Sequence, residues 1–355
     1  MRSWWIIVLL LWCMGCPDDG PSAGGDEDSV GTDSSDSGEE LDGAVLYSTY
    51  CSLCHGPVGE GFKADGANQL ANQSWLDIAS DVFITRSIVD GRPGTSMSAW
   101  GWERSGPLSE PQVDAMVAYI RAWHEGEVLD LSGVTVDGIA ERALPTWEFK
   151  CASCHGEAGG SADFMSVNNP VFLRDASDGY LKQSIVEGRP GTVMLGFGDS
   201  LTAQTIDDLV VLIRSWQVPV DQTPVKPGPV ELGAVEINPD GPEPDFSTEG
   251  DFVSVDELKA ALDAGARLGI LDARPASDYV KEHISGAVSV PFYEASKYLD
   301  QLPQDLWLVA YCACPHAESG AAAKVLKDNG YTQVKVLDEG FGVWKEKSYP
   351  TEALD

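Results

Sequence analysis

Two copies of the pattern Cys-x-x-Cys-His, at residues 51–55 and 151–155, carry the clearest chemistry in this chain. Two thiols at this spacing can add across the vinyl groups of a haem, and the imidazole that follows takes the iron. The copies begin 100 residues apart. We therefore expect two covalently bound haem c groups. Their attachment and proximal residues are Cys51, Cys54 and His55 for the first haem and Cys151, Cys154 and His155 for the second.

A second repeated motif, Gly-Arg-Pro-Gly-Thr-x-Met, follows each haem motif and ends at Met97 and Met194. The methionines lie 42 and 39 residues after His55 and His155. The glycines and the proline predict a tight turn, which lets the backbone come close to the macrocycle. Each haem therefore has a methionine ready as a second iron ligand.

The arginines of these turns, Arg92 and Arg189, are candidates for contacts with the haem propionates. A guanidinium group forms strong charge-assisted hydrogen bonds with a carboxylate. The alternative is a solvated arginine on the surface of the turn, and the sequence favours neither reading.

The elements that must position these motifs also repeat. Residues 43–127 and 138–217 each predict a helix before the cysteines, an irregular middle, the methionine loop and a closing amphipathic helix. Tyr47 and Trp147 both lie four residues before the first cysteine, which predicts one shared packing position. The closing helices carry apolar stripes at helical spacing. The stripes are Val113, Met116, Val117, Ile120 and Trp123 in the first repeat and Ile206, Leu209, Val210, Ile213 and Trp216 in the second.

Both repeats resemble class I cytochrome c domains on these motifs. The resemblance implies an all-α fold whose first and last helices cross near the haem, with a methionine loop on the distal side. It assigns His55 and His155 as proximal iron ligands and Met97 and Met194 as distal ones. His/Met ligation raises the reduction potential relative to bis-histidine and leaves no open position on the iron. We expect these haems to carry electrons rather than to activate a substrate.

The C-terminal residues 251–355 alternate between predicted strands and helices, which indicates a parallel sheet with helices on its faces. Three stretches resemble the rhodanese family: residues 271–275 leading to 283–287, residues 309–312, and residues 337–341 with Trp344 and Pro350. The resemblance implies an α/β rhodanese-like domain with Cys312 at the place of the family's nucleophile. Asp272 and Arg274 are expected to be structural supports of the loop after Cys312.

The loop from Cys312 to Ser319 departs from the family's pattern. It is one residue longer than the common sulfurtransferase loop and lacks the arginine that usually ends it. Glu318 stands where phosphatases of this fold have their phosphate-binding arginine, which disfavours phosphatase chemistry. His316 is the obvious cation of the loop, and only when protonated. Cys312 is thus a candidate persulfide-forming nucleophile or a buried thiol at a strand end, and Cys314 either resolves it or packs.

Acidic residues outnumber basic ones, 56 to 23, and more than half of the excess lies in connecting segments. Such runs of low hydrophobicity are usually solvated tethers. The charge disfavours nucleic acid and anionic membrane surfaces as partners. The expected organisation is a multidomain chain of two all-α domains and one α/β domain. Its segments are a signal peptide at 1–16, an acidic tether at 17–42, haem domains at 43–127 and 138–217, a Pro-rich acidic linker at 218–250, and the rhodanese-like domain at 251–355.

The first 15 residues predict a secretion signal, in which Arg2 precedes an apolar run shorter than the ~20 residues of a membrane crossing. The run ends in Gly15-Cys16, which resembles the lipobox of bacterial lipoproteins although Cys13 and Met14 are unusual there. The resemblance implies a lipid on Cys16 that holds the chain at a bacterial membrane, facing the periplasm. An ordinary cleaved signal is the alternative, and in both cases the mature chain is exported.

The haem motifs and Cys312 together admit three functions. In the first, a lipid-anchored dihaem protein passes electrons between periplasmic redox partners, and Cys312 accepts sulfane sulfur from small sulfur compounds such as thiosulfate. In the second, the haem pair is the whole activity and the C-terminal domain is a docking or sulfur-sensing module. In the third, the chain is a sulfurtransferase with Cys312 as nucleophile, which the missing arginine disfavours.

Overall fold

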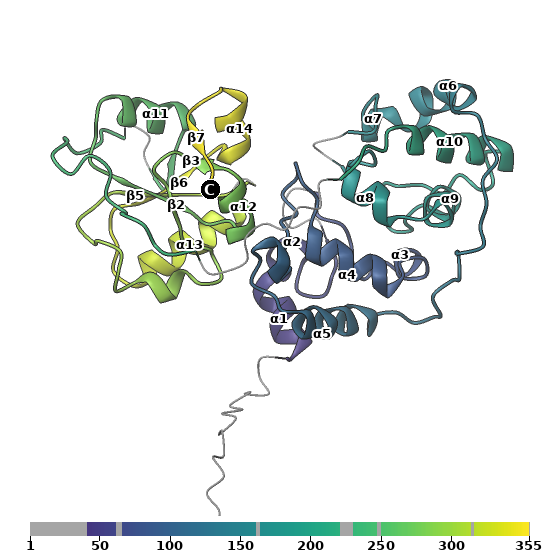
Figure 1. Ribbon diagram of the computed structural model, residues 1–355, viewed down its shortest axis with the longest axis horizontal. Helices are drawn as coiled ribbons and strands as arrows, with labels where there is room; N and C mark the ends of the chain where they lie inside the picture. The colour runs from purple at the N-terminus through teal and green to yellow at the C-terminus, as the bar shows by residue number, and fades with distance from the viewer. Residues whose placement is uncertain are drawn as a thin grey trace, which may run out of the picture. The chain divides into compact units, whose positions relative to one another are not determined.

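The computed structural model describes residues 41–61, 66–160, 164–220, 230–246, 250–313 and 316–354 (Figure 1). The predicted secretion signal, Cys16 and most of the acidic tether lie outside these residues. Cys314 in the loop after Cys312 lies outside them as well.

The first helical repeat begins at an N-cap, Asp42, whose carboxylate accepts from the backbone N–H groups of Ala44 and Val45. Helix α1 packs against the closing helix α5, which starts with a capping box between Ser109 and Gln112. The apolar stripe expected on α5 is buried from Val113 to Ile120, so the stripe does form the core. The helices are α1 (Gly43–Tyr50), α2 (Ser52–His55), α3 (Gln73–Leu76), α4 (Asp81–Asp90) and α5 (Glu110–Arg121).

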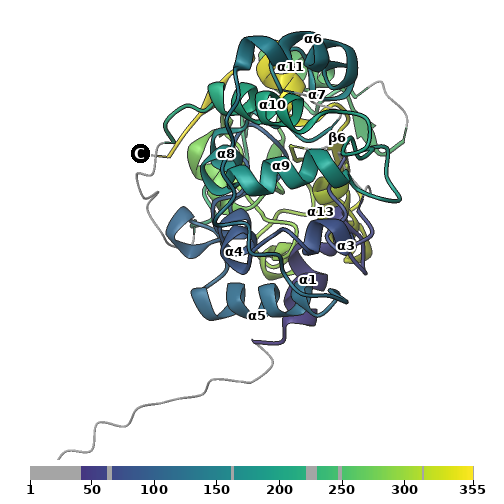
Figure 2. The ribbon, with the colours of Figure 1, turned by 90° about the vertical axis from the view of Figure 1, so that its right-hand side faces the viewer.

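The second helical repeat follows the same order, and its first helix α6 packs along its closing helix α10 (Figure 1). Thr202 caps α10 by accepting from the N–H of Thr205, as expected of this residue. Figure 2 shows α9 beside α10, a contact that corresponds to α4 beside α5 in the first repeat. The helices are α6 (Ala140–Lys150), α7 (Ala152–His155), α8 (Pro170–Asp175), α9 (Asp178–Glu187) and α10 (Ala203–Ser215).

The prediction of an irregular middle in each repeat was wrong, because α4 and α9 lie there. Both helices are capped by serines, Ser80 and Ser177, and both end at a glycine with positive φ that opens the methionine loop. Phe83, Ile84 and Ile88 are buried along α4. Each of these helices therefore anchors a methionine loop to the core.

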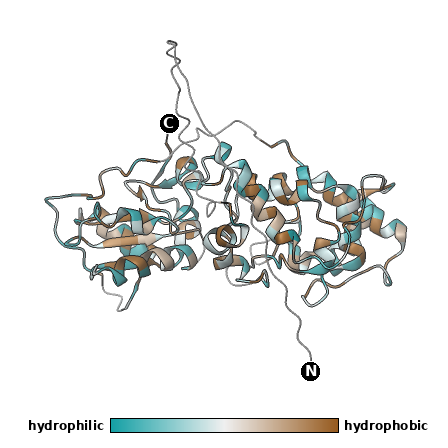
Figure 3. Cartoon of the chain, turned by 90° about the horizontal axis from the view of Figure 1, so that it is seen from below, coloured by the Kyte–Doolittle hydropathy of each residue, from teal (hydrophilic) through white to brown (hydrophobic). Residues whose placement is uncertain are grey.

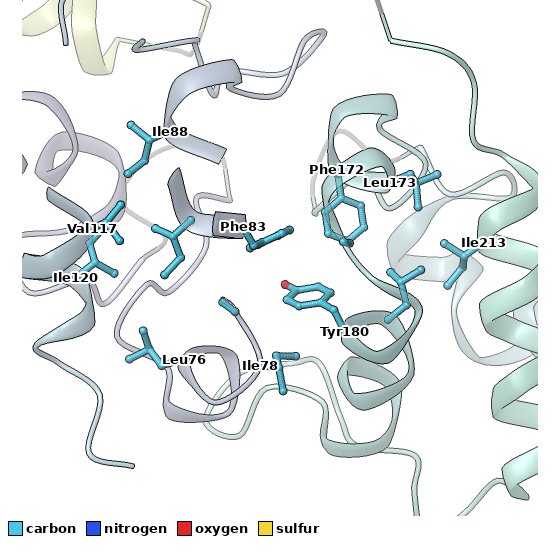
Figure 4. Packing of buried hydrophobic residues seen from close by; sticks show 14 of the residues in the cluster. Leu76, Ile78, Phe83, Ile88, Val117, Ile120, Phe172, Leu173, Tyr180 and Ile213 are labelled. Atoms are coloured by element: carbon cyan, nitrogen blue, oxygen red, sulfur yellow. The ribbon is translucent and has the colours of Figure 1, made fainter. Parts of the chain in front are cut away.

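The two helical repeats share one hydrophobic core. Phe83 of α4 stacks on Tyr180 of α9 at a centroid distance of 4.7 Å, and its edge meets Phe172 of α8 at 6.3 Å. Figure 4 shows these three rings turned toward one another between the repeats. Beside them Asp90 accepts from Arg104 of its own repeat at 2.7 Å and from Arg174 of the other at 2.6 Å. The two repeats are therefore joined by packing as well as by the connecting chain.

In the described residues of the C-terminal domain, five parallel strands form a sheet in the order β1-β6-β5-β2-β4, with helices packed on it. Figure 3 shows hydrophobic residues along its strands. The strands are β1 (Phe252–Val253), β2 (Gly269–Asp272), β4 (Val288–Ser289), β5 (Leu308–Tyr311) and β6 (Val334–Leu337). The other elements are α11 (Val255–Asp263), α12 (Ala276–Lys281), α13 (Ala317–Asp328), α14 (Gly340–Glu346) and the antiparallel pair β3 (His283–Ile284) and β7 (Thr351–Glu352).

Part of the expected Pro-rich linker packs on the C-terminal domain. Ile237 forms a bridge with Leu268, and Glu236 pairs with Arg267. Val235 is buried in the core of the sheet. Apolar side chains spaced along this acidic segment give it a surface to bury, so residues 230–246 run along the domain rather than away from it.

Candidate functional site

The haem motifs sit where one helix ends and a single helical turn begins. In both repeats the first cysteine breaks the helix, since Cys51 and Cys151 separate α1 from α2 and α6 from α7. The short turn closes through His55 N–H to Cys51 O and His155 N–H to Cys151 O, both at 2.9 Å. The two thiols and the imidazole are thereby held on one turn in each repeat.

Both predicted proximal histidines donate to a backbone carbonyl. Nδ1 of His55 lies 2.9 Å from the oxygen of Asn68, and Nδ1 of His155 lies 3.0 Å from the oxygen of Met165. A carbonyl only accepts, so Nδ1 carries the proton and Nε2 keeps its lone pair for a metal. Burial also lowers the pKa of His55, which favours the neutral imidazole that binds iron.

Tyr47 and Trp147 occupy the same packing position, as their spacing predicted. The hydroxyl of Tyr47 donates to the oxygen of Gly56 at 2.7 Å. The indole N–H of Trp147 donates to the oxygen of Gly156 at 3.2 Å and to that of Glu157 at 2.9 Å. In each repeat a ring from the first helix therefore fixes the chain just after the histidine.

The two methionine loops have the same hydrogen bonds. The N–H of Arg92 donates to the oxygen of Met97 at 2.7 Å, and the N–H of Arg189 donates to that of Met194 at 2.8 Å. Thr95 and Thr192 each bond both the arginine oxygen and the methionine N–H of their loop. Both methionines are half-buried at the tips of these closed loops. A shared backbone design of this kind presents one sulfur per repeat.

The two turn arginines point along their own helices. Arg92 donates to the oxygen of Gly91 at 2.8 Å and to Oγ of Ser87 at 2.6 Å. Arg189 makes the equivalent bonds to Gly188 and Ser184. These bonds tie each methionine loop to the helix before it. A contact with a haem propionate remains a prediction for the other donors of each guanidinium.

The residues present fit haem c. Burial raises the pKa of Cys51 to about 12 and that of Cys151 to about 11, so both are protonated thiols at neutral pH. Zinc sites use thiolates instead. Within the described residues, no three His, Cys, Asp or Glu side chains gather into a metal cluster. The donor set of each motif is thus two thiols for covalent attachment and one oriented imidazole.

The candidate nucleophile Cys312 directly follows β5 and is fully buried at 0% exposure. Its Sγ lies 3.2 Å from Oγ of Ser319 in the first turn of α13. Its backbone oxygen accepts from the N–H of Phe341 at 2.9 Å. The strand end and α14 therefore fix the backbone of Cys312, and α13 contacts its sulfur.

Asp272 and Arg274 form the buried support expected beneath this loop. Arg274 donates to Asp272 through Nε at 2.9 Å and Nη2 at 2.6 Å, and its guanidinium lies over the Phe341 ring at 4.1 Å. The hydroxyl of Tyr311, the residue before Cys312, donates to Asp272 at 2.6 Å. This network links the ends of β2 and β5.

Glu318, expected to act as a carboxylate in this loop, is buried. It is only 4% exposed, and burial raises its pKa well above the ordinary value, with Cys312 and Asp278 adding to the effect. Burial therefore favours the neutral carboxyl form of this side chain over the carboxylate. His316, the cation considered in this loop, lies with Nε2 2.8 Å from Asp338 Oδ1. The described part of the loop thus offers no unpaired positive charge to an anion.

Comparisons with known proteins agree with both halves of this geometry. A family model described as cytochrome C oxidase, cbb3-type, subunit III matches residues 38–120 and 140–213. A rhodanese-like domain model matches residues 254–347. The chain is a tandem pair of cytochrome c domains followed by a rhodanese-like domain. Two haem c groups are its cofactors, one for each cytochrome domain.

Individual relatives match one half or the other. The cytochrome half is 29% identical to the cbb3-type cytochrome c oxidase subunit CcoP of Azospirillum brasilense, over 49% of this chain and 60% of that protein. The rhodanese-like half is 31% identical to an HTH-type transcriptional regulator of Mycobacterium tuberculosis, over 29% of this chain and 45% of that protein. It is 28% identical to the probable adenylyltransferase/sulfurtransferase MoeZ of the same species, over 29% and 27%. The chain thus spans about three fifths of the length of its cytochrome relative.

Two asparagines at the junction of the cytochrome domains escaped sequence reasoning. Asn72 and Asn169 cap α3 and α8, and each also donates to the methionine loop of the other domain. Their positions one residue before a helix are a recognisable capping signal. The second bond crosses between domains, and nothing in the local sequence indicates it.

Proposed function

We propose that this protein is an exported, membrane-anchored electron carrier that serves redox partner proteins through two His/Met haems, with sulfane sulfur handled at Cys312. The observation that carries the proposal is the doubling of one site. Each cytochrome domain repeats the oriented histidine, the closed methionine loop and the ring that fixes the chain after the histidine. Two equivalent one-electron sites in one chain are the arrangement of a relay.

The ligands in this proposal are His55 and Met97 in the first domain and His155 and Met194 in the second. A haem bound at each site would supply one-electron chemistry. The protein holds the imidazole through its Nδ1 bond and the sulfur loop through its internal bonds, so these side chains would have to move little during electron transfer. Ligation by both side chains would disfavour oxygen chemistry at the iron.

Export and membrane attachment rest on the sequence. The first 16 residues predict a secretion signal that ends in a lipid-bearing Cys16. Among the helices of the described residues, none has the length and apolar character needed to cross a membrane. A lipid anchor followed by the acidic tether at 17–42 would hold the cytochrome domains at a membrane surface.

The sulfur branch of the proposal rests on Cys312 and its fold position. A low-molecular-weight persulfide R–S–SH would transfer its outer sulfur to Cys312–SH, giving Cys312–S–SH and R–SH. This exchange moves one sulfur atom and is redox-neutral. Oxidation of this persulfide with three water molecules would give Cys312–SH, hydrogen sulfite, five protons and four electrons. The two haems, each taking one electron, would accept the four electrons in two rounds. The described part of the loop offers no unpaired positive charge, because His316 lies against Asp338, and this favours an uncharged or singly charged sulfur donor over a dianion such as thiosulfate.

A second function, a non-catalytic docking or sulfur-sensing module, is favoured by the complete burial of Cys312. The third, a sulfurtransferase, is disfavoured because the described part of the loop holds no unpaired cation. Thiocyanate formation from cyanide and a persulfide donor separates them. Rapid turnover that needs Cys312 supports the third function. A Cys312 persulfide without turnover supports either of the other two.

The ligand assignment has its own experiment. Ferric His/Met haems show a near-infrared band from the bond between iron and sulfur. Met97→Ala and Met194→Ala should each remove about half of this band and lower the reduction potential of one haem. A Met165→Ala variant, whose backbone oxygen still holds His155, is the matched control and should retain the whole band. A full band in either ligand variant would refute that assignment.

A further inference from the structure

The rhodanese-like domain contacts the first cytochrome domain directly beside the predicted ligand Met97. The hydroxyl of Ser98 donates to Oδ2 of Asp278 at 2.6 Å. The hydroxyl of Ser277 donates to the oxygen of Ala99, also at 2.6 Å. Ser277 and Asp278 lie next to each other in α12, and Ser98 and Ala99 are the two residues after Met97.

These two bonds are shielded from water. Ser98 is 4% exposed, and Ala99 and Ser277 are also buried. A hydrogen bond to a carboxylate is about twice as strong as one between neutral groups. The bond from Ser98 to Asp278 is of that kind, so it restrains the backbone immediately beside the sulfur ligand.

An aromatic cluster closes the same contact. Tyr293 of the rhodanese-like domain meets the Tyr50 ring at 5.0 Å and the Trp100 ring at 6.0 Å. Phe292 meets Trp100 edge to face at 6.4 Å. Tyr50 directly precedes Cys51, and Trp100 ends the methionine loop. The cluster therefore contacts both the start of the first haem motif and the end of the first methionine loop.

Among the residues that the structure describes, no such contact covers the methionine loop of the second cytochrome domain. Val193 and Leu195, which flank Met194, are 69% and 68% exposed. Leu195 stands at the position that Ser98 holds in the first domain. The two methionine loops share their internal bonds, so the contact with α12 is what makes them differ.

We propose that the rhodanese-like domain is the intramolecular docking partner of the first cytochrome domain, and that Ser277 and Asp278 are positioning residues that hold the Met97 loop closed. The first haem is then protected from ligand displacement, and the second is the haem whose methionine loop opens readily. This inference rests on the proposed ligation by Met97 and Met194.

The loop of Cys312 is connected to this contact through helix α13. Helix α13, which starts in that loop, packs against α2 of the first cytochrome domain. Glu318 in its first turn interacts electrostatically with both Cys312 and Asp278. The docking surface therefore lies between the candidate sulfur site and the loop that carries Met97.

Displacement of methionine by imidazole in the full-length ferric holoprotein tests the proposal. Loss of the near-infrared iron–sulfur band should proceed in two phases, and the phase missing from the Met97→Ala variant belongs to the first haem. We expect that phase to be the slower one. Ser98→Ala and Ser277→Ala should each accelerate it about ten-fold, because each removes one buried hydrogen bond. The phase of the second haem should stay within about two-fold.

Ser200→Ala is the matched control, since it removes a serine bond to the oxygen of Phe197 near the second methionine loop without crossing domains. It should leave the slow phase unchanged. Hydrogen exchange gives a readout independent of the haem, and the amides from Met97 to Trp100 should exchange faster in the Ser98 and Ser277 variants.

The outcomes separate the two claims. If the wild-type protein lacks the iron–sulfur band, the ligation proposal fails and the docking role falls with it. If the band is present but neither serine variant changes the slow phase, the docking role alone is overturned. Equal acceleration of both phases would also overturn it.

Discussion

The side-chain amide of Asn72 lies 3.0 Å from the backbone oxygen of Pro190, in the methionine loop of the other cytochrome domain. Asn169 returns the same bond to the oxygen of Pro93 at 2.9 Å. Each domain thus supports the methionine loop of the other domain. The two haem sites are therefore coupled through the protein backbone as well as through the shared aromatic core.

Replacing these asparagines by serine separates the coupling from the cap. Serine keeps the N-cap function but is too short to reach the other domain. Asn72→Ser and Asn169→Ser should each lower the free energy of unfolding of the cytochrome pair by about 1 kcal/mol, measured in urea by haem absorbance. Asn329→Ser, which removes a bond to the oxygen of Val325 in the rhodanese-like domain, is the control and should not affect the haem signal. Equal effects in all three variants would contradict this coupling.

The ion pairs of Asp90 predict that the two cytochrome domains lose stability at low pH. Burial alone would raise its pKa, but hydrogen bonds from Arg104 and Arg174 outweigh burial and hold the pKa below the ordinary 3.8. The stability from this ion pair is present above the unfolded pKa and is lost as the pH falls through the folded one.

Asp90→Asn should therefore lower the melting temperature at neutral pH and reduce its decline below about pH 4. The measurement is thermal unfolding followed by haem absorbance across the acid range. An unchanged acid slope in the variant would assign that slope to other carboxyl groups.

Glu318 predicts that the stability of the rhodanese-like domain depends on pH with the opposite sign. Its pKa is raised by burial above the ordinary 4.5, so between the unfolded and folded values the folded chain binds more protons. Stability from this site therefore falls as the pH rises. Glu318→Gln, which keeps the shape and cannot ionise, should flatten the decline in melting temperature that begins as the pH rises above 4.5, the ordinary value for this group. Asp328→Asn on the exposed face of α13 is the control and should decline as the wild type does. If the melting temperature of Glu318→Gln declined as steeply as that of the wild type, Glu318 would not be the titrating group.

The sequence predicted the parts of this molecule that depend on local pattern. The closing helices, the strands of the sheet and the haem motifs follow from apolar spacing and fixed residue patterns. Phe83, Phe172 and Tyr180 are ordinary apolar residues within their helices, so their meeting across domains leaves no mark in the sequence. The acidic connectors predicted solvated tethers, but composition reports on the connectors and not on the surfaces they join.

In the candidate sites too, local pattern predicts some features, and others depend on packing between distant elements. Cys312 could be located from its place after a strand, because a family pattern fixes that register. The burial that raises the pKa of Glu318 depends on α13 packing against other elements, and a formal charge count treats this residue as an anion. The contact between Ser98 and Asp278 joins residues 180 positions apart, a separation at which local pattern is silent.

The most direct test of the central claim follows haem reduction by a sulfur donor. Oxidised full-length protein is mixed without oxygen with glutathione persulfide, and the visible α band is recorded for the wild type and for Cys312→Ala. We predict that both haems of the wild type become reduced. In the variant, haem reduction should be at least about ten-fold slower, a factor equivalent to about 1.4 kcal/mol in the activation barrier. Reduction at equal rates in the two proteins would contradict a role for Cys312 in supplying electrons and would leave the rhodanese-like domain as a docking module.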